Sequence, residues 1–315
     1  MGSRSLYIAT VLIWGTTWFA IEFQLGVVAP AVSVFYRYAA ASLLLFGWCR
    51  YRGLSLRYGL RDHARFVLLG LLLFCLNYII TYHAQQYITS ALSAIAFSTM
   101  LWMNIINSRV FFGVRAGWRV TIGSLVGVAG IVVLFYPQID AMDWSDATFY
   151  GATLCVGGAF LASLGNMVSQ SAQNHGLPIV QSNAWGMLYG AVLTGAIAYL
   201  QGLTFAFDLS VPYVLSLAYL VVFGSIMAFG AYLTLLGRIG AHKAGYALVM
   251  FLVVALVLSI LFEGLEFTPG IAVGILLVIV GNLLILRRKG GSARNDTRVT
   301  DKEHGSACLQ ADLAT

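Results

Sequence analysis

One arginine stands inside an apolar segment that is long enough to cross a lipid bilayer. The stretch FYRYAAASLLLFGW, residues 35–48, carries no charge except that of Arg37. About seven residues separate Arg37 from the nearer end of its segment, which places it roughly 10 Å deep at 1.5 Å per residue. An ionisable side chain at this depth is a candidate functional residue. Arg37 either binds the carboxylate of a substrate or has a structural role, pairing with Glu22 or extending its side chain to the interface.

Two tryptophans lie on one face of the apolar segment that comes before. Trp14, Trp18 and Glu22 follow one another in steps of four residues, which brings their side chains to the same side of a helix. Glu22 stands at the end of that segment, where a tight hairpin would bring it towards Arg37. We therefore predict that Trp14 and Trp18 contact a substrate and that Glu22 is the partner of Arg37.

Tyrosines with polar neighbours supply the next candidates, which are Asn77, Tyr78, Tyr82 and His83. Tyr78 and Tyr82 share a helical face, and a tyrosine offers an aromatic wall with a polar tip. The alternative is that Tyr82 and His83 belong to the belt of residues found at membrane interfaces. We include all four in the predicted substrate-binding site.

A stripe of two apolar side chains and two amides marks the segment that follows. Phe97, Met100, Asn104 and Asn107 are spaced so that they line one helical face. Asparagines can bind the ammonium and carboxylate groups of a zwitterion while Phe and Met hold its side chain; alternatively, the amides bond one helix to another. Further candidates, each of which could equally be a packing residue, are Trp102, Ser163, Asn166, Trp185, Tyr189 and Tyr246.

Membrane-spanning helices must position these residues, because the composition argues against a soluble protein. Of the 315 residues, 60% are hydrophobic and 10% are charged, whereas soluble domains carry about 25% charged residues. A spanning helix needs about 20 mostly apolar residues. Ten stretches qualify, at residues 5–23, 30–49, 65–84, 89–111, 118–136, 147–170, 179–201, 212–236, 243–263 and 268–286. The predicted fold class is an all-α polytopic membrane protein with ten transmembrane helices.

The positions of the basic residues indicate how these helices are oriented. Every Lys and Arg other than Arg37 lies before the first stretch, after the last one, or at an even-numbered connection. The odd-numbered connections hold acidic residues such as Asp143, Asp208 and Glu266. Cytoplasmic loops are rich in Lys and Arg. Both termini are therefore predicted to be cytoplasmic, with residues 289–315 forming a disordered tail.

The two halves of the chain resemble each other. Gly123 and Gly130 in the stretch 118–136 match Gly274 and Gly281 in the stretch 268–287, each pair seven residues apart. An odd number of helices per repeat inverts the second repeat relative to the first, and inverted repeats are typical of secondary transporters. We predict two inverted five-helix repeats at 1–137 and 147–288; chance similarity between apolar sequences is the alternative.

Several motifs carry a resemblance to a known family. They are LIWGTTWFA at 12–20, FYRYAAASLLL at 35–45 and ALSAIAFSTML at 91–101, followed by Glu263, Pro269 and the glycines of the last stretch. In order and spacing they resemble the EamA domain of the drug/metabolite transporter superfamily, and the chain is most similar to bacterial amino-acid exporters, including aromatic amino acid exporters. The resemblance implies ten helices, a central cavity and alternating access. FFGVRAGW in the first half departs from LFEGLEFTP in the second, so the symmetry is not expected to be complete.

The distribution of charged residues limits the transport mechanism and the substrate classes that are compatible with the sequence. No Asp or Glu lies deep in a predicted helix, so we expect facilitated diffusion or weak coupling rather than a proton relay through a buried carboxylate. A carrier of phosphorylated compounds would need more than one intramembrane cation. The histidines are too scattered for a catalytic set, and we predict no enzyme activity, metal, cofactor or nucleic-acid partner.

We therefore expect a carrier in the bacterial inner membrane that exports aromatic or hydrophobic amino acids, or related metabolites, by alternating access. The alternative substrate class is drugs or organic cations, because tryptophan and tyrosine attract cations. A channel and an intramembrane enzyme are further alternatives. The G-x-x-x-G steps in the sequence are compatible with either a monomer or a homodimer.

Overall fold

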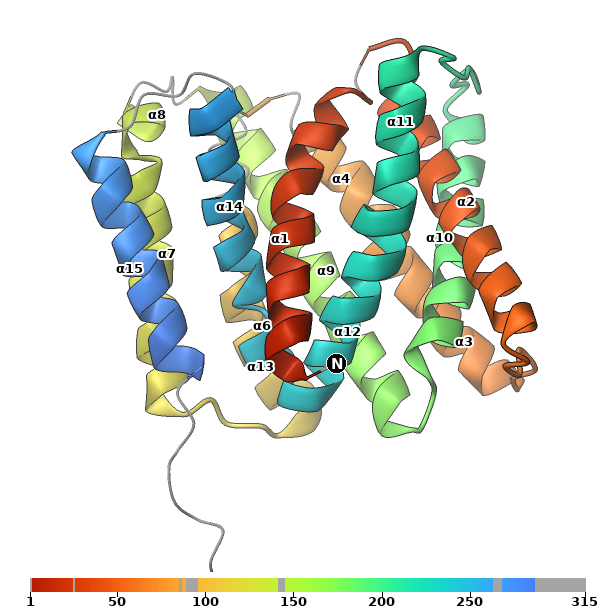
Figure 1. Cartoon of the computed structure of the whole chain (residues 1–315), viewed down its shortest axis with the longest axis horizontal. Helices are drawn as coiled ribbons and strands as arrows, with labels where there is room; N and C mark the ends of the chain where they lie inside the picture. The colour runs from red at the N-terminus through yellow and green to blue at the C-terminus, as the bar shows by residue number, and fades with distance from the viewer. Residues whose placement is uncertain are drawn as a thin grey trace, which may run out of the picture. The chain divides into compact units, whose positions relative to one another are not determined.

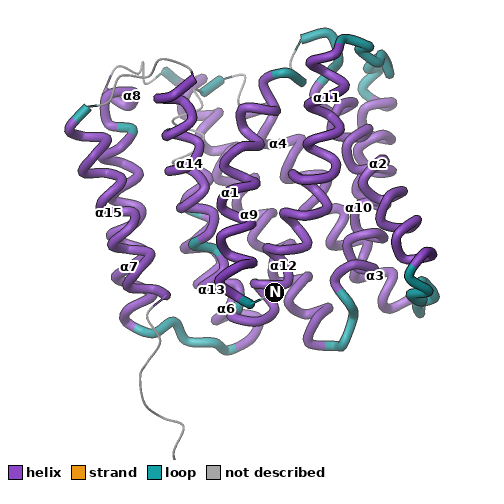
Figure 2. Tube along the Cα trace, in the orientation of Figure 1, coloured by secondary structure: helices purple, strands orange, loops and turns teal. Residues whose placement is uncertain are grey.

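Every regular element in the part of the chain that the structure describes is a helix (Figure 2). The computed structural model describes residues 2–24, 26–84, 87–88, 96–140, 145–262 and 268–286. In chain order the elements are α1 (Ser3–Glu22), α2 (Pro30–Tyr51), α3 (Leu60–Leu69), the π-helical η1 (Gly70–Leu76), α4 (Asn77–Ala84), α6 (Met100–Phe112), α7 (Trp118–Leu134), α8 (Tyr136–Asp140), α9 (Asp146–Asn174), α10 (Ile179–Leu200), α11 (Val211–Tyr219), the π-helical η2 (Leu220–Met227), α12 (Ala228–Ile239), α13 (Ala241–Ala244), α14 (Ala247–Phe262) and α15 (Pro269–Leu286).

Apolar helices occupy the predicted membrane segments. Four continuous helices in the described residues are long and apolar enough to cross a bilayer, at Pro30–Tyr51, Leu60–Thr81, Asp146–Asn174 and Val211–Ile239. Shorter apolar helices include Trp118–Leu134, Ala241–Val254 and Pro269–Ile285. For the described residues, the prediction of an all-helical fold with several apolar helices is therefore confirmed.

The helix predicted at 65–84 begins earlier than expected, at Leu60. Its first turns are polar, and Arg65 pairs with Asp62 at 2.8 Å on the same helix face. Asp62 also lies in the first turn, where a negative charge is favourable near the N-terminus of a helix. A prediction based on apolar residues places the start of the helix after these charged residues, although the helix itself includes them.

Proline and glycine mark several helix ends. Pro30 and Pro269 are the first residues of α2 and α15, where the missing N–H would have no partner in any case. Gly113 ends α6 with φ at 67°, a left-handed conformation that favours glycine. Ser145 precedes α9 and accepts a hydrogen bond from the N–H of Thr148 at 3.4 Å.

Two π-helical segments interrupt long helices at matching places in the two halves. η1 begins at Gly70 and η2 begins at Leu220, 150 residues later. Each lies inside a continuous apolar helix, Leu60–Thr81 and Val211–Ile239 respectively. π-Helical turns are rare and occur frequently at functional sites. η1 contributes Leu73 to the cavity described below, and η2 bonds to two of the residues that line it, Trp14 and Arg37.

Helices far apart in the sequence pack closely against one another. α2 lies along α10, and α1 lies between α12 and α14 (Figure 1). η1 approaches α10 through glycine: a Cβ on Gly70 would lie 2.6 Å from the carbonyl oxygen of Gly186 and 2.7 Å from the nitrogen of Gly190. The G-x-x-x-G step at 186–190 thus brings two helices of the same chain together.

α7 and α15 form a second glycine-mediated pair (Figure 1). A Cβ on Gly130 would lie 2.8 Å from the carbonyl oxygen of Gly274, and a Cβ on Gly274 would lie 2.8 Å from that of Gly130. Tyr246, which is fully buried, donates to the carbonyl oxygen of Val278 at 3.0 Å. In the part of the chain that the structure describes, the residues up to Ile285 belong to one packed unit.

Candidate binding cavity

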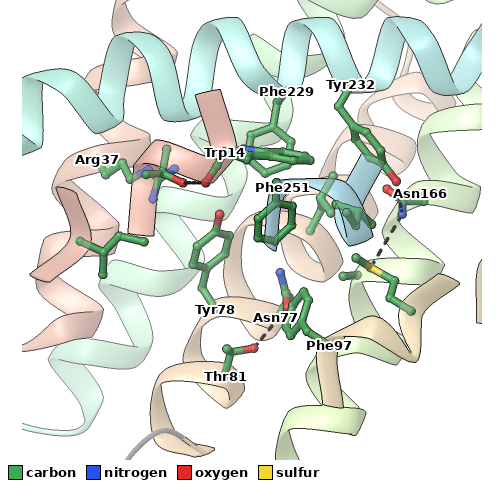
Figure 3. A pocket seen from close by; sticks show the side chains of 16 residues that line it. Trp14, Arg37, Asn77, Tyr78, Thr81, Phe97, Asn166, Phe229, Tyr232 and Phe251 are labelled. Carbon is green, nitrogen blue, oxygen red and sulfur yellow. Dashed lines mark hydrogen bonds between the residues drawn. The ribbon is translucent and has the colours of Figure 1, made fainter. Parts of the chain in front are cut away.

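A cavity of about 140 Å³ lies among α1, α2, α4, α6, α9, α12 and α14 (Figure 3). An engineered protein cavity of about 150 Å³ binds benzene, so this space can hold one aromatic ring. The side chains that line it are Trp14, Thr17, Ile21, Arg37, Leu73, Asn77, Tyr78, Thr81, Phe97, Met100, Ala162, Asn166, Phe229, Tyr232, Leu248 and Phe251.

Aromatic rings form one wall of the cavity. Trp14 meets Phe229 edge-to-face at 5.1 Å between ring centroids, and it lies 5.0 Å from Tyr232 and 6.3 Å from Phe251. Such offset and edge contacts are the favoured geometries for aromatic pairs. The indole N–H of Trp14 donates to the carbonyl oxygen of Gly224 in η2 at 3.3 Å. Trp14 is therefore fixed in orientation, and the wall can hold a planar apolar group.

Arg37 lies at one end of the cavity and is only 4% exposed. Its Nε donates to the Oγ of Ser225, in η2, at 2.7 Å. Its guanidinium carbon lies 5.4 Å from the ring of Tyr38 and 5.7 Å from the ring of Tyr78, within the range of cation–π attraction. These contacts explain how an apolar segment accommodates the charge, because Arg37 faces the protein interior. The side chain of Glu22, its predicted partner, lies outside the described residues.

A group of amides and a phenol lies at the other end of the cavity (Figure 3). The Nδ2 of Asn166 donates to the hydroxyl of Tyr232 at 3.1 Å and to the Oδ1 of Asn104 at 3.3 Å. The Oδ1 of Asn166 and the Nδ2 of Asn104 are buried and have no hydrogen-bond partner in the described part of the chain. Buried polar atoms normally have a partner, so these two atoms call for an explanation.

The cavity brings together seven of the candidate residues, which are Trp14, Arg37, Asn77, Tyr78, Phe97, Met100 and Asn166. Asn104 lies just behind the cavity wall, fully buried and bonded to Asn166. Trp18 and Tyr82 were also predicted, but their side chains lie outside the described residues.

The remaining predicted residues lie away from this cavity. Ser163 accepts from the Nδ2 of Asn107 at 2.9 Å, between α9 and α6. Trp185 packs against Phe46 and against His63 of α3, with ring centroids 4.9 Å and 4.6 Å apart.

Two further aromatic residues and a histidine are also separate from it. Tyr246 packs against α15 through its hydrogen bond to Val278. Trp102 is half-buried, and His83 is exposed beside the ring of Tyr87.

Sequence reasoning missed nine of the lining residues, which are Thr17, Ile21, Leu73, Thr81, Ala162, Phe229, Tyr232, Leu248 and Phe251. Thr17 follows Trp14 by three residues, so the helical repeat could have identified it. Tyr232 is a tyrosine within an apolar run and carries the same signal as Tyr78. Phe229 and Phe251 belong to helices that are apolar on all sides, where the sequence gives no sign of which face points inward.

The fold indicates a polytopic helical membrane protein, and its internal cavity is large enough for a small molecule. The chain belongs to the EamA-like transporter family, whose family model matches it twice, at residues 4–136 and 149–287. The resemblance to the EamA domain is therefore confirmed, and the protein is a membrane transporter of this family.

Individual proteins agree with this assignment. The inner membrane transporter YedA of Escherichia coli is 28% identical over 245 residues, which cover 76% of this chain and 76% of YedA. The transporter YoaV of Bacillus subtilis is 24% identical and covers 87% of this chain and 93% of its own length. PagO of Salmonella typhimurium is 21% identical, with coverage of 89% and 91%. A crystal structure with 16% identity shares the fold, with a TM-score of 0.76 over 90% of this chain and 96% of that one.

Proposed function

We propose that this protein exports aromatic or hydrophobic amino acids, or closely related metabolites, across the bacterial inner membrane by alternating access. The observation that carries the proposal is the cavity itself. It holds aromatic rings along one wall, a buried arginine at one end and amides at the other. An arginine suits a carboxylate, and the aromatic wall suits a planar apolar side chain.

The described cavity lining supports facilitative or weakly coupled transport. It contains one ionisable cation, Arg37, and none of its described side chains is an Asp or a Glu. Proton-driven carriers commonly use an intramembrane carboxylate as a relay. Without such a group, the gradient of the amino acid itself drives export.

We further propose that two inverted five-helix repeats, 1–137 and 147–288, enclose the cavity. The two matches of the family model and the 150-residue spacing of η1 and η2 support this arrangement. So does the contact between α2 and α10, which occupy corresponding places in the two halves. Binding sites between such repeats lie near the membrane midplane.

The same arrangement supports both termini being cytoplasmic. α1 begins and α15 ends on the lower side of Figure 1, where the α2–α3, α6–α7 and α12–α13 connections also lie. Basic residues lie in these connections or at the helix ends beside them, among them Arg57, Arg115 and Arg238, whereas Asp208 lies in the α10–α11 connection on the upper side. By the positive-inside rule, the lower side is cytoplasmic.

Hydrogen bonds on that side would have to break for the cavity to open inward. The Nε2 of Gln173 in α9 donates to the carbonyl oxygen of Leu233 in α12 at 2.9 Å. The Oε1 of Gln170 accepts from the N–H of Ala241 at 3.1 Å. We propose that α9 separates from α12 and α13 during the transition to the inward-facing state.

Efflux of drugs or organic cations is the second candidate, and the aromatic lining is compatible with it. The charge of Arg37 argues against it, because a buried cation at the end of the cavity repels another cation. Uptake of labelled amino acids into proteoliposomes, in competition with a panel that includes cationic dyes, distinguishes the two. Saturable amino-acid uptake that the dyes leave unchanged supports the proposal; dye uptake without amino-acid uptake overturns it.

A further inference from the structure

The amide group at the far end of the cavity contains an acceptor that the protein leaves unused. Asn166 lines the cavity and is 1% exposed. Its Nδ2 is committed to Tyr232 and Asn104, while its Oδ1 is buried without a partner in the described residues. An isolated buried acceptor of this kind costs about 1–3 kcal/mol unless a partner arrives. A ligand in the cavity can supply that partner.

The distance between the two ends of the cavity limits which ligand group can reach Asn166. Arg37 bonds to Ser225, and Asn166 bonds to Tyr232, and both of these residues belong to the continuous helix Val211–Ile239. Seven residues separate them, which corresponds to about 10 Å along the helix axis. The ammonium and carboxylate groups of an α-amino acid share one carbon, so they cannot bind at opposite ends of this cavity.

Aromatic rings lie between the two polar ends. Figure 3 places Arg37 on one side and Asn166 with Tyr232 on the other, with Trp14, Phe251 and Phe229 between them. This order of cation, aromatic wall and amide matches a molecule with a carboxylate at one end, a ring in the middle and a polar group at its far end. Tyrosine and 5-hydroxytryptophan have this form, whereas phenylalanine and tryptophan have no polar group at the far end of the ring.

We propose that Asn166, held in place by Tyr232, binds a hydroxyl group, such as the phenol O–H of tyrosine, at the distal end of an aromatic substrate. The inference rests on the proposed function, since it adds a specificity-determining residue to the same cavity. A phenyl ring in this position would leave the Oδ1 of Asn166 without a partner and exclude the water that could have served it. Sites built around a hydrogen bond discriminate against the analogue that lacks the bonding group.

The test measures ligand binding by the purified protein in two matched pairs, tyrosine against phenylalanine and 5-hydroxytryptophan against tryptophan, whose members differ only by a hydroxyl at the far end of the ring. One neutral hydrogen bond contributes about fivefold to affinity. We expect the wild-type protein to bind the first member of each pair about fivefold more tightly. We expect the ratio to fall to about one in Asn166→Leu, which keeps a similar volume without the acceptor.

A matched control is Asn107→Leu, because Asn107 is also a buried asparagine but bonds to Ser163 away from the cavity. Its binding ratio should stay at the wild-type value. Equal affinities within each pair in the wild type would overturn the inference, and that measurement does not depend on any variant folding. An equal loss for both members in folded Asn166→Leu would also overturn it, because it would indicate that Asn166 binds the shared ammonium group.

Transport of the same pairs into proteoliposomes separates this inference from the proposed function. Discrimination in binding without any amino-acid transport would overturn the proposed function and support the assignment of Asn166. Transport of both members of each pair, with no difference in their binding affinities, would support the proposed function and overturn the assignment of Asn166.

Discussion

Replacement of Arg37 by glutamine should abolish the preference for carboxylates that we propose for this transporter. Arg37 is the cation at the end of the cavity, and a hydrogen bond to a charged group contributes about 1.5–3 kcal/mol. Loss of that contribution corresponds to about a 10- to 150-fold weaker interaction with a carboxylate. Arg37→Gln should therefore raise the KM for tyrosine by a factor in this range. Arg37→Lys, which keeps the charge but not the planar fork, should give an intermediate value.

The variant is expected to fold, so the transport defect can be interpreted. In Arg37→Gln the hydroxyl of Ser225 loses its 2.7 Å bond from Nε, a loss of about 1 kcal/mol. Removal of a buried charge also removes its desolvation penalty, which offsets part of that loss. Size-exclusion profiles in detergent should match those of the wild type.

The assay compares uptake of tyrosine with uptake of tyrosinamide in proteoliposomes. The wild type should strongly favour tyrosine, and Arg37→Gln should transport the two with similar KM values. Arg109→Gln is the matched control, because Arg109 is exposed at the end of α6 and distant in sequence from the cavity residues of that helix. If folded Arg37→Gln kept the wild-type KM for tyrosine, Arg37 would be a structural residue and the reasoning would be refuted.

Three further predictions concern packing and orientation. Gly281→Val should lower the melting temperature in detergent, because the added Cβ would lie 2.5 Å from a backbone carbonyl oxygen of α7. In the control Gly157→Ala, the added Cβ has nothing within 4 Å and should leave the melting temperature unchanged or raise it slightly; equal effects of the two variants would contradict the packing of α7 on α15. Tyr246→Phe removes a hydrogen bond to the backbone of α15 and should reduce the free energy of unfolding by about 1 kcal/mol without changing the KM; a large change in KM would return Tyr246 to the binding site. In a cysteine-free background, Ser55→Cys in the proposed cytoplasmic α2–α3 connection should react with an impermeant maleimide only after the cells are opened. Thr204→Cys in the proposed external α10–α11 connection should react in intact cells, and the reverse pattern would contradict the proposed orientation.

The fold could be predicted from the sequence because the bilayer imposes a simple length requirement. Helices that must satisfy their own backbone hydrogen bonds across about 30 Å of hydrocarbon appear as long apolar stretches. The two π-helical segments could not be predicted, because GLLLFCL at 70–76 and LVVFGSIM at 220–227 read as ordinary apolar helix. Their departure from α-helical geometry depends on the helices that pack against them.

The binding cavity could be predicted only where polarity distinguished a residue from its surroundings. Arg37 and Asn77 stand out in apolar stretches, and the structure places both in the cavity lining. Phe229 and Phe251 do not stand out, since the rotation of an apolar helix is set by its neighbours. Trp185 has an aromatic ring with a polar atom, but it packs against residues of α2 and α3.

Exchange across a membrane tests the central proposal most directly, since a carrier must present one cavity to each side in turn. Proteoliposomes loaded with unlabelled tyrosine should take up labelled tyrosine from outside faster than empty ones do, and the rate should saturate with the external concentration. Identical uptake by loaded and empty proteoliposomes, or uptake that rises linearly without saturation, would contradict alternating access to this cavity.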